Sequence, residues 1–200
     1  MIVFVRHGQT AVNAAGQLQG RVDRELTDLG LTQAGRLAQS LRGAPVARVV
    51  TSPLRRAADT ARVIADGLGL DIEIDDRLVE LDYGEWDQRA FSEIAAAEWD
   101  AWRADPKFAP PGGESLVDVT ARVASFCDEQ LGPELVVAVS HVSPIKGAVC
   151  LALGVDERAS FRMHLDIASI TRIDRRGSDG PAFIASYNET SHLTTSLGSA

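Results

Sequence analysis

Hydrophobic and polar positions along the chain form two alternating patterns, short apolar runs and longer segments with one apolar face. Short runs bounded by polar residues are typical of buried strands, and apolar residues spaced three or four apart are typical of helices that cover a sheet. The strand pattern occurs at residues 1–6, 46–51, 70–75, 135–140, 167–174 and 182–187. The helix pattern occurs at about 28–42, 53–68, 90–104, 114–130 and 144–153.

The order of these elements predicts the fold class. Strands that alternate with helices are typical of a parallel sheet with helices on both faces. The last two strands flank a turn at 176–180 and predict an antiparallel hairpin. We therefore expect an α/β fold, a three-layer α/β/α sandwich whose sheet is mostly parallel with an antiparallel hairpin strand at the C-terminal end. Residues 1–200 contain no repeat or linker, and their number fits one domain.

One segment, at about 77–113, departs from the alternation. It contains all three tryptophans and ends in a loop rich in proline and glycine at 106–113. We interpret it as an insertion and a candidate lid. The tryptophans are expected to form the core of the insertion rather than a surface on which a ligand stacks.

Composition narrows the range of partners. The formal net charge is −8, and a strongly acidic protein is repelled by nucleic acids and by anionic membranes. No apolar stretch is long enough to span a membrane, and the N-terminus lacks the pattern of a signal peptide. Cys127 and Cys150 lie in apolar patterns and are expected to be buried free thiols. We expect a cytoplasmic protein with no nucleic-acid or membrane partner.

Polar side chains follow four predicted strands at their carboxyl ends, where open parallel sheets bind ligands. Arginine is the residue best suited to grip a phosphoryl group, neutral histidine can attack phosphorus, and a carboxylic acid can protonate the leaving group. The sequence therefore predicts an anion pocket with two imidazoles and an acid, suited to phosphoryl transfer through a phosphohistidine. The side chains concerned are Arg6 and His7, Arg55 and Arg56, Glu80 and Asp82, and His141.

A zinc site is the alternative use of two histidines and two carboxylates. Three arginines beside them would repel a divalent cation, and neither H-E-x-x-H nor C-x-x-C occurs in the chain. We expect no metal and no cofactor. Spacing alone does not choose between Glu80 and Asp82 as the acid.

Five motifs occur in a fixed order along nearly the whole chain. They are R-H-G-Q-T from Arg6, L-T-D-L-G with Q-A from Leu26, S-P-L-R-R-A with Thr60, E-L-D-Y-G from Glu80, and S-H at 140–141. Together with Asn13, Gln19 and Gly20 they resemble the histidine phosphatase superfamily, in its phosphoglycerate mutase-like branch. The resemblance selects Glu80 over Asp82 as the acid.

The resemblance implies that His7 is the nucleophile and Glu80 the general acid and base. It implies a phosphate pocket formed by Arg6, Asn13, Gln19, Gly20, Arg56 and His141. The chain departs from the family at Val142, where glycine is usual and its amide often faces the phosphate. A positive φ would strain valine, so this departure puts the geometry of the loop after His141 in question.

The reaction has alternatives that the residues leave open. The family's mutases are longer and carry more basic residues in the insertion, whereas residues 86–113 hold only Arg89, Arg103 and Lys107. Tyr83, in contrast, matches a tyrosine that the mutases use. We expect a phosphatase acting on a small phosphorylated metabolite, with a cofactor-dependent phosphoglycerate mutase as the alternative. A non-catalytic phosphate-binding regulatory module is disfavoured, because none of the expected residues is missing.

The remaining expectations concern the surroundings of the pocket. Arg21 and Arg24 are equally compatible with contacting the substrate and with being solvated surface residues. We assign no role to His164 and a structural role to His192. The mechanism predicts an acidic to near-neutral pH optimum, and an exposed edge strand leaves a homodimer possible.

Overall fold

A six-stranded mixed sheet forms the middle layer of the structure, a computed structural model that describes residues 1–177 and 180–194. The strands are β1 (Ile2–Arg6), β2 (Val46–Thr51), β3 (Ile72–Ile74), β4 (Leu135–Ser140), β5 (Ile170–Arg175) and β6 (Ala182–Glu189), in the spatial order β3-β2-β4-β1-β5-β6. The first four are mutually parallel, and β5 is antiparallel to both β1 and β6. The expected mostly parallel sheet with an antiparallel hairpin is confirmed. The centre of the expected hairpin turn, residues 178–179, lies outside the described residues.

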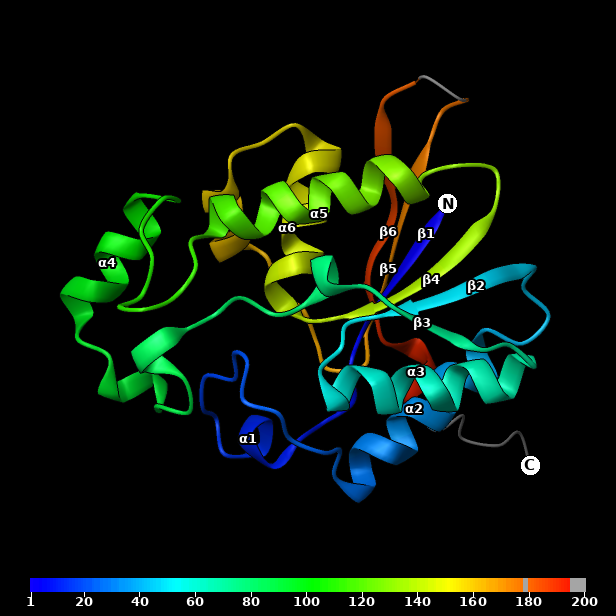
Figure 1. Ribbon diagram of the computed structural model, residues 1–200, viewed down its shortest axis with the longest axis horizontal. Helices are drawn as coiled ribbons and strands as arrows, with labels where there is room; N and C mark the ends of the chain where they lie inside the picture. The colour runs from blue at the N-terminus through cyan, green and yellow to red at the C-terminus, as the bar shows by residue number, and fades with distance from the viewer. Residues whose placement is uncertain (178–179, 195–200) are drawn as a thin grey trace.

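Helices cover both faces of this sheet (Figure 1). Helices α2 and α3 pack on one face, and α5 and α6 pack on the other. The helices are α1 (Ala11–Ala14), α2 (Asp28–Ser40), α3 (Arg55–Leu68), α4 (Ala96–Ala104), α5 (Leu116–Gln130) and α6 (Val142–Leu153). Short 3-10 helices occupy Asp76–Leu78, Gly84–Trp86, Phe91–Glu93, Glu157–Arg162 and Ser191–Leu193. No helix in the described part of the chain is long and apolar enough to cross a membrane.

The strands are buried on both sides because successive side chains point to opposite faces. In β1, Ile2 and Phe4 pack in the core under α5 and α6, whereas Val3 and Val5 pack under α2 and α3. This is why the central strands are nearly continuous apolar runs instead of alternating apolar and polar residues. Cys127 and Cys150 are buried and free, as expected.

Four helices begin at other residues than the sequence pattern indicates: α4 begins at Ala96 and not at 90, α5 begins at Leu116 and not at 114, and α3 and α6 also differ. Helix α3 begins at Arg55 and not at Pro53, because the Ser52 amide still donates to Val139 O (3.0 Å) and continues the sheet. Helix α6 begins at Val142 and not at 144, because the carboxylate of Glu80 accepts hydrogen bonds from the amides of Val142 and Ser143. A capping group remote in sequence cannot be read from the local pattern.

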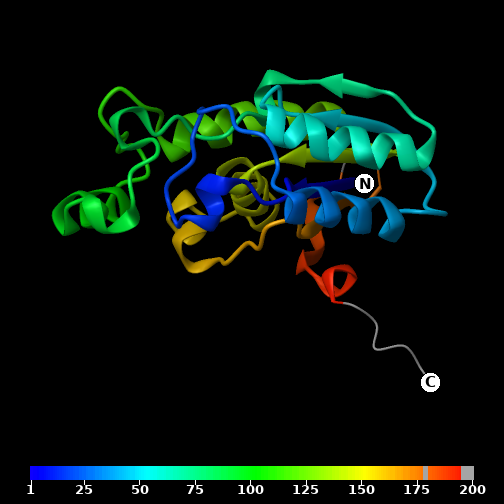
Figure 2. The same cartoon turned by 90° about the horizontal axis from the view of Figure 1, so that it is seen from below.

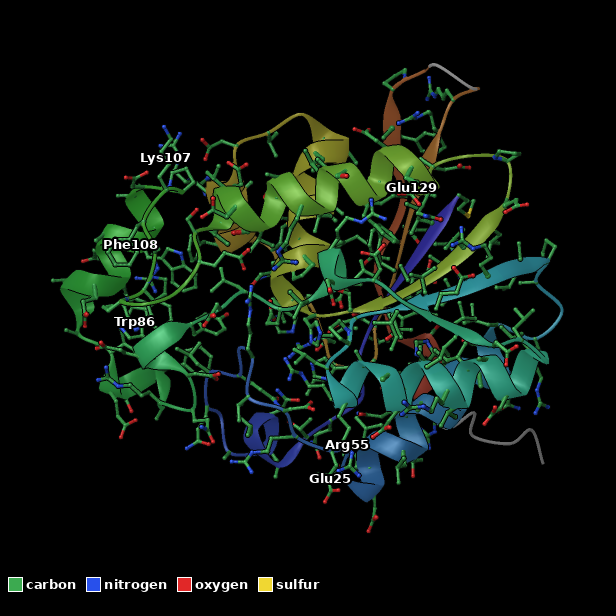
Figure 3. The ribbon with its side chains drawn as sticks, in the orientation of Figure 1. Glu25, Arg55, Trp86, Lys107, Phe108 and Glu129 are labelled. Atoms are coloured by element: carbon green, nitrogen blue, oxygen red, sulfur yellow. The ribbon has the colours of Figure 1, made fainter. Side chains whose placement is uncertain are left out.

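The aromatic segment 84–113 lies beyond the carboxyl ends of the strands, beside the 3-10 helix Glu157–Arg162 (Figures 1 and 2). Trp86 is 1% exposed, and its ring centroid lies 5.9 Å from that of Phe108 within the same segment (Figure 3). Trp102 packs edge-on against Phe161 with centroids 5.1 Å apart. The segment therefore has an aromatic core of its own that is continuous with the rest of the protein.

The loop after β1 is held against α2 and α3. A Cβ atom on Gly30 would lie 2.2 Å from Gln9 O, so the loop and the helix meet backbone to backbone. The side chains of Gln33 and Thr60 accept hydrogen bonds from the amides of Gln9 (2.9 Å) and Gly8 (3.0 Å). Several motif residues outside the pocket therefore fix the position of the loop.

Two glycines of α2 give a matched test of this contact. We expect Gly30→Ala to lower the free energy of unfolding by about 1–3 kcal/mol, because its methyl group overlaps backbone atoms that cannot move independently. We expect Gly35→Ala to raise it by up to about 1 kcal/mol, since Gly35 faces open space and alanine favours the helix. Urea-induced unfolding measures both changes, and equal effects of the two substitutions would contradict the close contact.

Candidate active site

Parallel pairing of β1 with β4 brings the two strand-end histidines together. Arg6 pairs with Ser140 in the register of the two strands, so His7 and His141 follow at the same edge of the sheet. Their ring centroids are 5.0 Å apart, and the exposed fractions of the two residues are 2% and 0%. The two motifs, separated by more than half the chain, thus meet in one buried place.

The neighbours of His7 determine its protonation. Nδ1 lies 2.7 Å from Gly8 O, and because a carbonyl can only accept, Nδ1 carries the hydrogen. Nε2 accepts a hydrogen bond from Arg56 Nε (3.2 Å), so it holds a lone pair. Burial, followed by the charges of Arg56 and Arg6, lowers the pKa of His7 well below 6.5. The imidazole is therefore neutral, with its lone pair on Nε2.

Arg56 is a fully buried cation beside this lone pair. Its Nη1 donates to Val22 O (3.0 Å) and its Nη2 donates to Gly20 O (2.7 Å). Burial lowers the pKa of Arg56 to about 10, yet within the described residues no carboxylate lies at ion-pair distance from it. The guanidinium has five N–H groups and uses three, so two remain for a ligand.

Glu80 is held by three backbone amides. Its Oε1 accepts from Leu81 N (2.8 Å) and Ser143 N (3.1 Å), and its Oε2 accepts from Val142 N (3.1 Å). Val142 occupies the first position of α6 and has no positive φ, so the strain considered for this valine does not arise. Its amide is directed to Glu80.

Three buried nitrogen atoms around His7 have no hydrogen-bond partner among the described residues: Arg6 Nε, Gln19 Nε2 and His141 Nδ1. Each of them can donate a hydrogen bond. His141 does so when it is in the tautomer that carries the hydrogen on Nδ1. Buried donors are ordinarily paired, so three unpaired donors in one place indicate a binding site for an acceptor-rich ligand. His141 is held at its other nitrogen by Ser52 Oγ, 2.8 Å from Nε2.

Asn13 and Gly20 are placed differently from each other. Asn13 lies in the cavity wall, where its Oδ1 accepts from the amide and hydroxyl of Thr10. Gly20 does not line the cavity, because its amide donates to Asp87 Oδ1 (2.8 Å) and its carbonyl accepts from Arg56. The backbone of Gly20 therefore holds Arg56 in place.

A comparison with known protein families identifies the arrangement. The sequence profile of the histidine phosphatase superfamily (branch 1) matches residues 2–189.

The chain belongs to the histidine phosphatase superfamily, branch 1.

The resemblance inferred from the five motifs is thereby confirmed. The chain is 39% identical over 199 residues to the Bifunctional protein Rv2228c of Mycobacterium tuberculosis, and the match covers 96% of this chain and 54% of that protein. It thus spans about half the length of this curated relative. Two solved phosphatase structures share the fold. Mycobacterial glucosyl-3-phosphoglycerate phosphatase Rv2419c is 33% identical with a TM-score of 0.84, and the match covers 94% of this chain and 98% of that one. Entamoeba histolytica phosphoserine phosphatase in complex with 3-phosphoglyceric acid is 27% identical with a TM-score of 0.88, and the match covers 96% of this chain and 98% of that one.

The cavity of this histidine phosphatase has a volume of about 330 Å³ and is lined by polar and aromatic side chains. Arg6, His7, Asn13, Gln19 and Glu80 line it, whereas Arg56 and His141 lie beside His7 and are not among the lining residues. Six further side chains line the cavity: Phe91, Trp99, Trp102, Phe161, His164 and Lys146. The sequence predicted none of them as pocket residues and placed the two tryptophans in the core of the insertion. Trp99 and Trp102 therefore belong both to the core of the insertion and to the cavity.

Several charged residues considered from the sequence lie elsewhere. Arg21 pairs with Glu114 (3.3 Å) and Asp82 (3.7 Å), and Arg24 donates to Gln88. Arg55 pairs with Glu25 at the surface (3.1 Å; Figure 3). His192 lies 2.9 Å from Ala168 O and has a structural contact, as expected. Among the described residues, no group of three histidine, cysteine or acidic side chains is placed to hold a metal ion.

The buried imidazoles give a pH prediction. Burial lowers the pKa of both His7 and His141 well below 6.5, so the folded protein keeps them neutral where the unfolded chain binds protons. Stability should consequently decrease as the pH falls below about 6.5. NMR titration of the two imidazoles should show protonation well below pH 6.5 in the folded protein and near 6.5 in urea. Titration near 6.5 in both states would contradict the geometry.

Proposed function

We propose that this histidine phosphatase hydrolyses small phosphomonoesters through a covalent phosphohistidine on His7. The observation that carries the proposal is the group of unpartnered donors, Arg6 Nε, Gln19 Nε2 and His141 Nδ1, around the neutral Nε2 of His7. A phosphoryl group offers three acceptor oxygens and negative charge, which this group of donors and the buried Arg56 can match. Asn13, in the cavity wall, is a further contact for the phosphate.

The first step transfers the phosphoryl group to the enzyme. The lone pair on His7 Nε2 attacks phosphorus and forms the P–N bond while the ester P–O bond breaks. The leaving oxygen takes a proton from the carboxylic acid of Glu80 and departs as an alcohol. The hydrogen on Nδ1 remains bonded to Gly8 O and keeps the ring in its orientation.

The second step releases phosphate. The carboxylate of Glu80 removes a proton from water, the water oxygen attacks phosphorus, and the P–N bond breaks to regenerate neutral His7. Three backbone amides hold the same carboxyl group for both steps. The enzyme requires positioned donors and one acid for this sequence of steps.

The size of the cavity favours a small phosphorylated metabolite. A volume of about 330 Å³ lies at the lower end of small-molecule sites. The names of the related phosphatases agree with this class, since one acts on glucosyl-3-phosphoglycerate and another on phosphoserine.

Substitution of the nucleophile tests the reaction. We expect His7→Ala to lower hydrolysis of p-nitrophenyl phosphate by at least about a thousandfold, because no covalent intermediate can form. His192→Ala, a histidine outside the cavity, is the matched control and should retain activity. Unchanged hydrolysis by His7→Ala would refute the nucleophile and leave phosphate binding as the function.

The products separate hydrolysis from mutase activity. When wild-type protein is given 3-phosphoglycerate with catalytic 2,3-bisphosphoglycerate, we expect free phosphate to form faster than 2-phosphoglycerate. The reverse order would replace the phosphatase by a mutase while preserving the role of His7.

The role of Glu80 depends on the leaving group. An alkoxide needs a proton and p-nitrophenolate does not, so Glu80→Gln should lower kcat on an alkyl phosphate by about 10²- to 10⁴-fold. Loss on p-nitrophenyl phosphate should stay below about tenfold in the first step. Asp82→Asn, which removes the nearby acid outside the cavity, is the control. A larger effect of Asp82→Asn would reverse the assignment of the acid.

A further inference from the structure

Lys146 lines the active-site cavity. It is one of only two lysines in the chain and lies on α6, in the turn after the residues that hold Glu80. Within the described residues, no hydrogen bond or ion pair involves its ammonium group. The nearby charge of Glu80 acts on Lys146 without a hydrogen bond between them. The oxygens of Glu80 already accept hydrogen bonds from three backbone amides.

Helix geometry explains why this side chain reaches the cavity. Val142 and Lys146 are four residues apart, so they lie on the same face of α6. Side chains of a helix lean toward its N-terminus, which brings Lys146 over the turn that contains Val142. Both residues line the active-site cavity and also a small adjoining cavity of about 70 Å³.

One of the residues that line the small cavity, Trp102, carries a second unsatisfied donor. Trp102 is 4% exposed and lines both cavities, and its Nε1 is buried with no partner among the described residues. A buried indole N–H ordinarily donates to an acceptor. The hydroxyl-bearing residues Tyr83, Ser143 and Ser160 complete the polar part of the lining.

Lys146 has an unbalanced charge in this position. Burial, followed by the nearby charge of Arg6, lowers its pKa, so the surroundings disfavour the ammonium ion. A second anionic group on the ligand would supply the missing partner. A volume of about 70 Å³ corresponds to roughly two water molecules, which suits a carboxylate better than a second phosphoryl group.

We propose that Lys146 and Trp102 form a subsite for a carboxylate on the organic part of the substrate. The preferred substrates are then phosphomonoesters that also carry a carboxylate, and the ammonium and indole N–H both donate to it. This inference rests on the proposed phosphatase function, because it concerns the leaving-group side of the same cavity.

Two substrates that differ only in the carboxylate test the subsite: O-phosphoserine and O-phosphoethanolamine. We expect the wild type to prefer O-phosphoserine in kcat/KM. Lys146→Met should lower kcat/KM for O-phosphoserine on the order of ten- to a hundredfold, mainly through KM, and leave O-phosphoethanolamine within about twofold. The unchanged second substrate also shows that the variant folds.

Two further variants sharpen the result. Lys107→Met is the matched control, because Lys107 is the other lysine and lies exposed on the insertion (Figure 3); it should leave the preference unchanged. Trp102→Phe keeps the aromatic ring and removes the N–H, and it should reduce the preference severalfold.

The outcomes distinguish this inference from the proposed function. Equal losses on both substrates in Lys146→Met would overturn the subsite and place Lys146 at the phosphate. Equal use of both substrates by the wild type would also overturn it, while hydrolysis that depends on His7 would still support the phosphatase. If the protein hydrolyses neither of the two substrates nor p-nitrophenyl phosphate, the result would count against both the subsite and the phosphatase function.

Discussion

The site is organised around one buried positive charge, the guanidinium of Arg56. Its N–H groups reach His7 and the carbonyl oxygens of Gly20 and Val22, and none of these partners carries a negative charge. A buried cation without an anion is costly, and the phosphoryl group of the proposed substrate would relieve that cost. Burial, followed by the charge of Arg56, lowers the pKa of His7, so the same cation serves both roles in the proposed reaction, as a phosphate donor and as a cause of the neutral imidazole.

This local arrangement reconciles the acidic composition with the proposed binding of phosphate esters. The net charge of −8 describes the surface, where many arginines are paired with carboxylates, for example Arg55 with Glu25 and Arg158 with Asp156. Arg56 is buried and Arg6 is half-buried, and the structure gives them carbonyl or imidazole partners instead. An extended polyanion would meet the acidic surface, whereas the single phosphoryl group of the proposed substrate would meet only the pocket.

Strand ends were predictable from the sequence because a buried parallel strand leaves a clear apolar run, and the next polar residue must lie at the edge of the sheet. That reasoning placed Arg6, His7 and His141 together. It missed Lys146 and Trp102, since a helix periodicity shows which residues share a face but not what that face meets. The spacing of Lys146 from Val142 was the available signal. The remote cap of α6 by Glu80 and the partners of Gly20 needed tertiary contacts, which no local pattern contains.

Helix α6 connects the reacting centre to the proposed subsite. Val142 and Ser143 hold Glu80, and Lys146 lies on the following turn of the same helix. One helical turn separates neighbouring side chains by about 5–6 Å, and the helix cannot stretch as a loop can. Helix α6 therefore fixes the distance between the backbone amides that hold Glu80 and the Cα atom of Lys146. With a carboxylate bound at the proposed subsite, this distance would restrict the number of bonds that separate the phosphate of a substrate from its carboxylate.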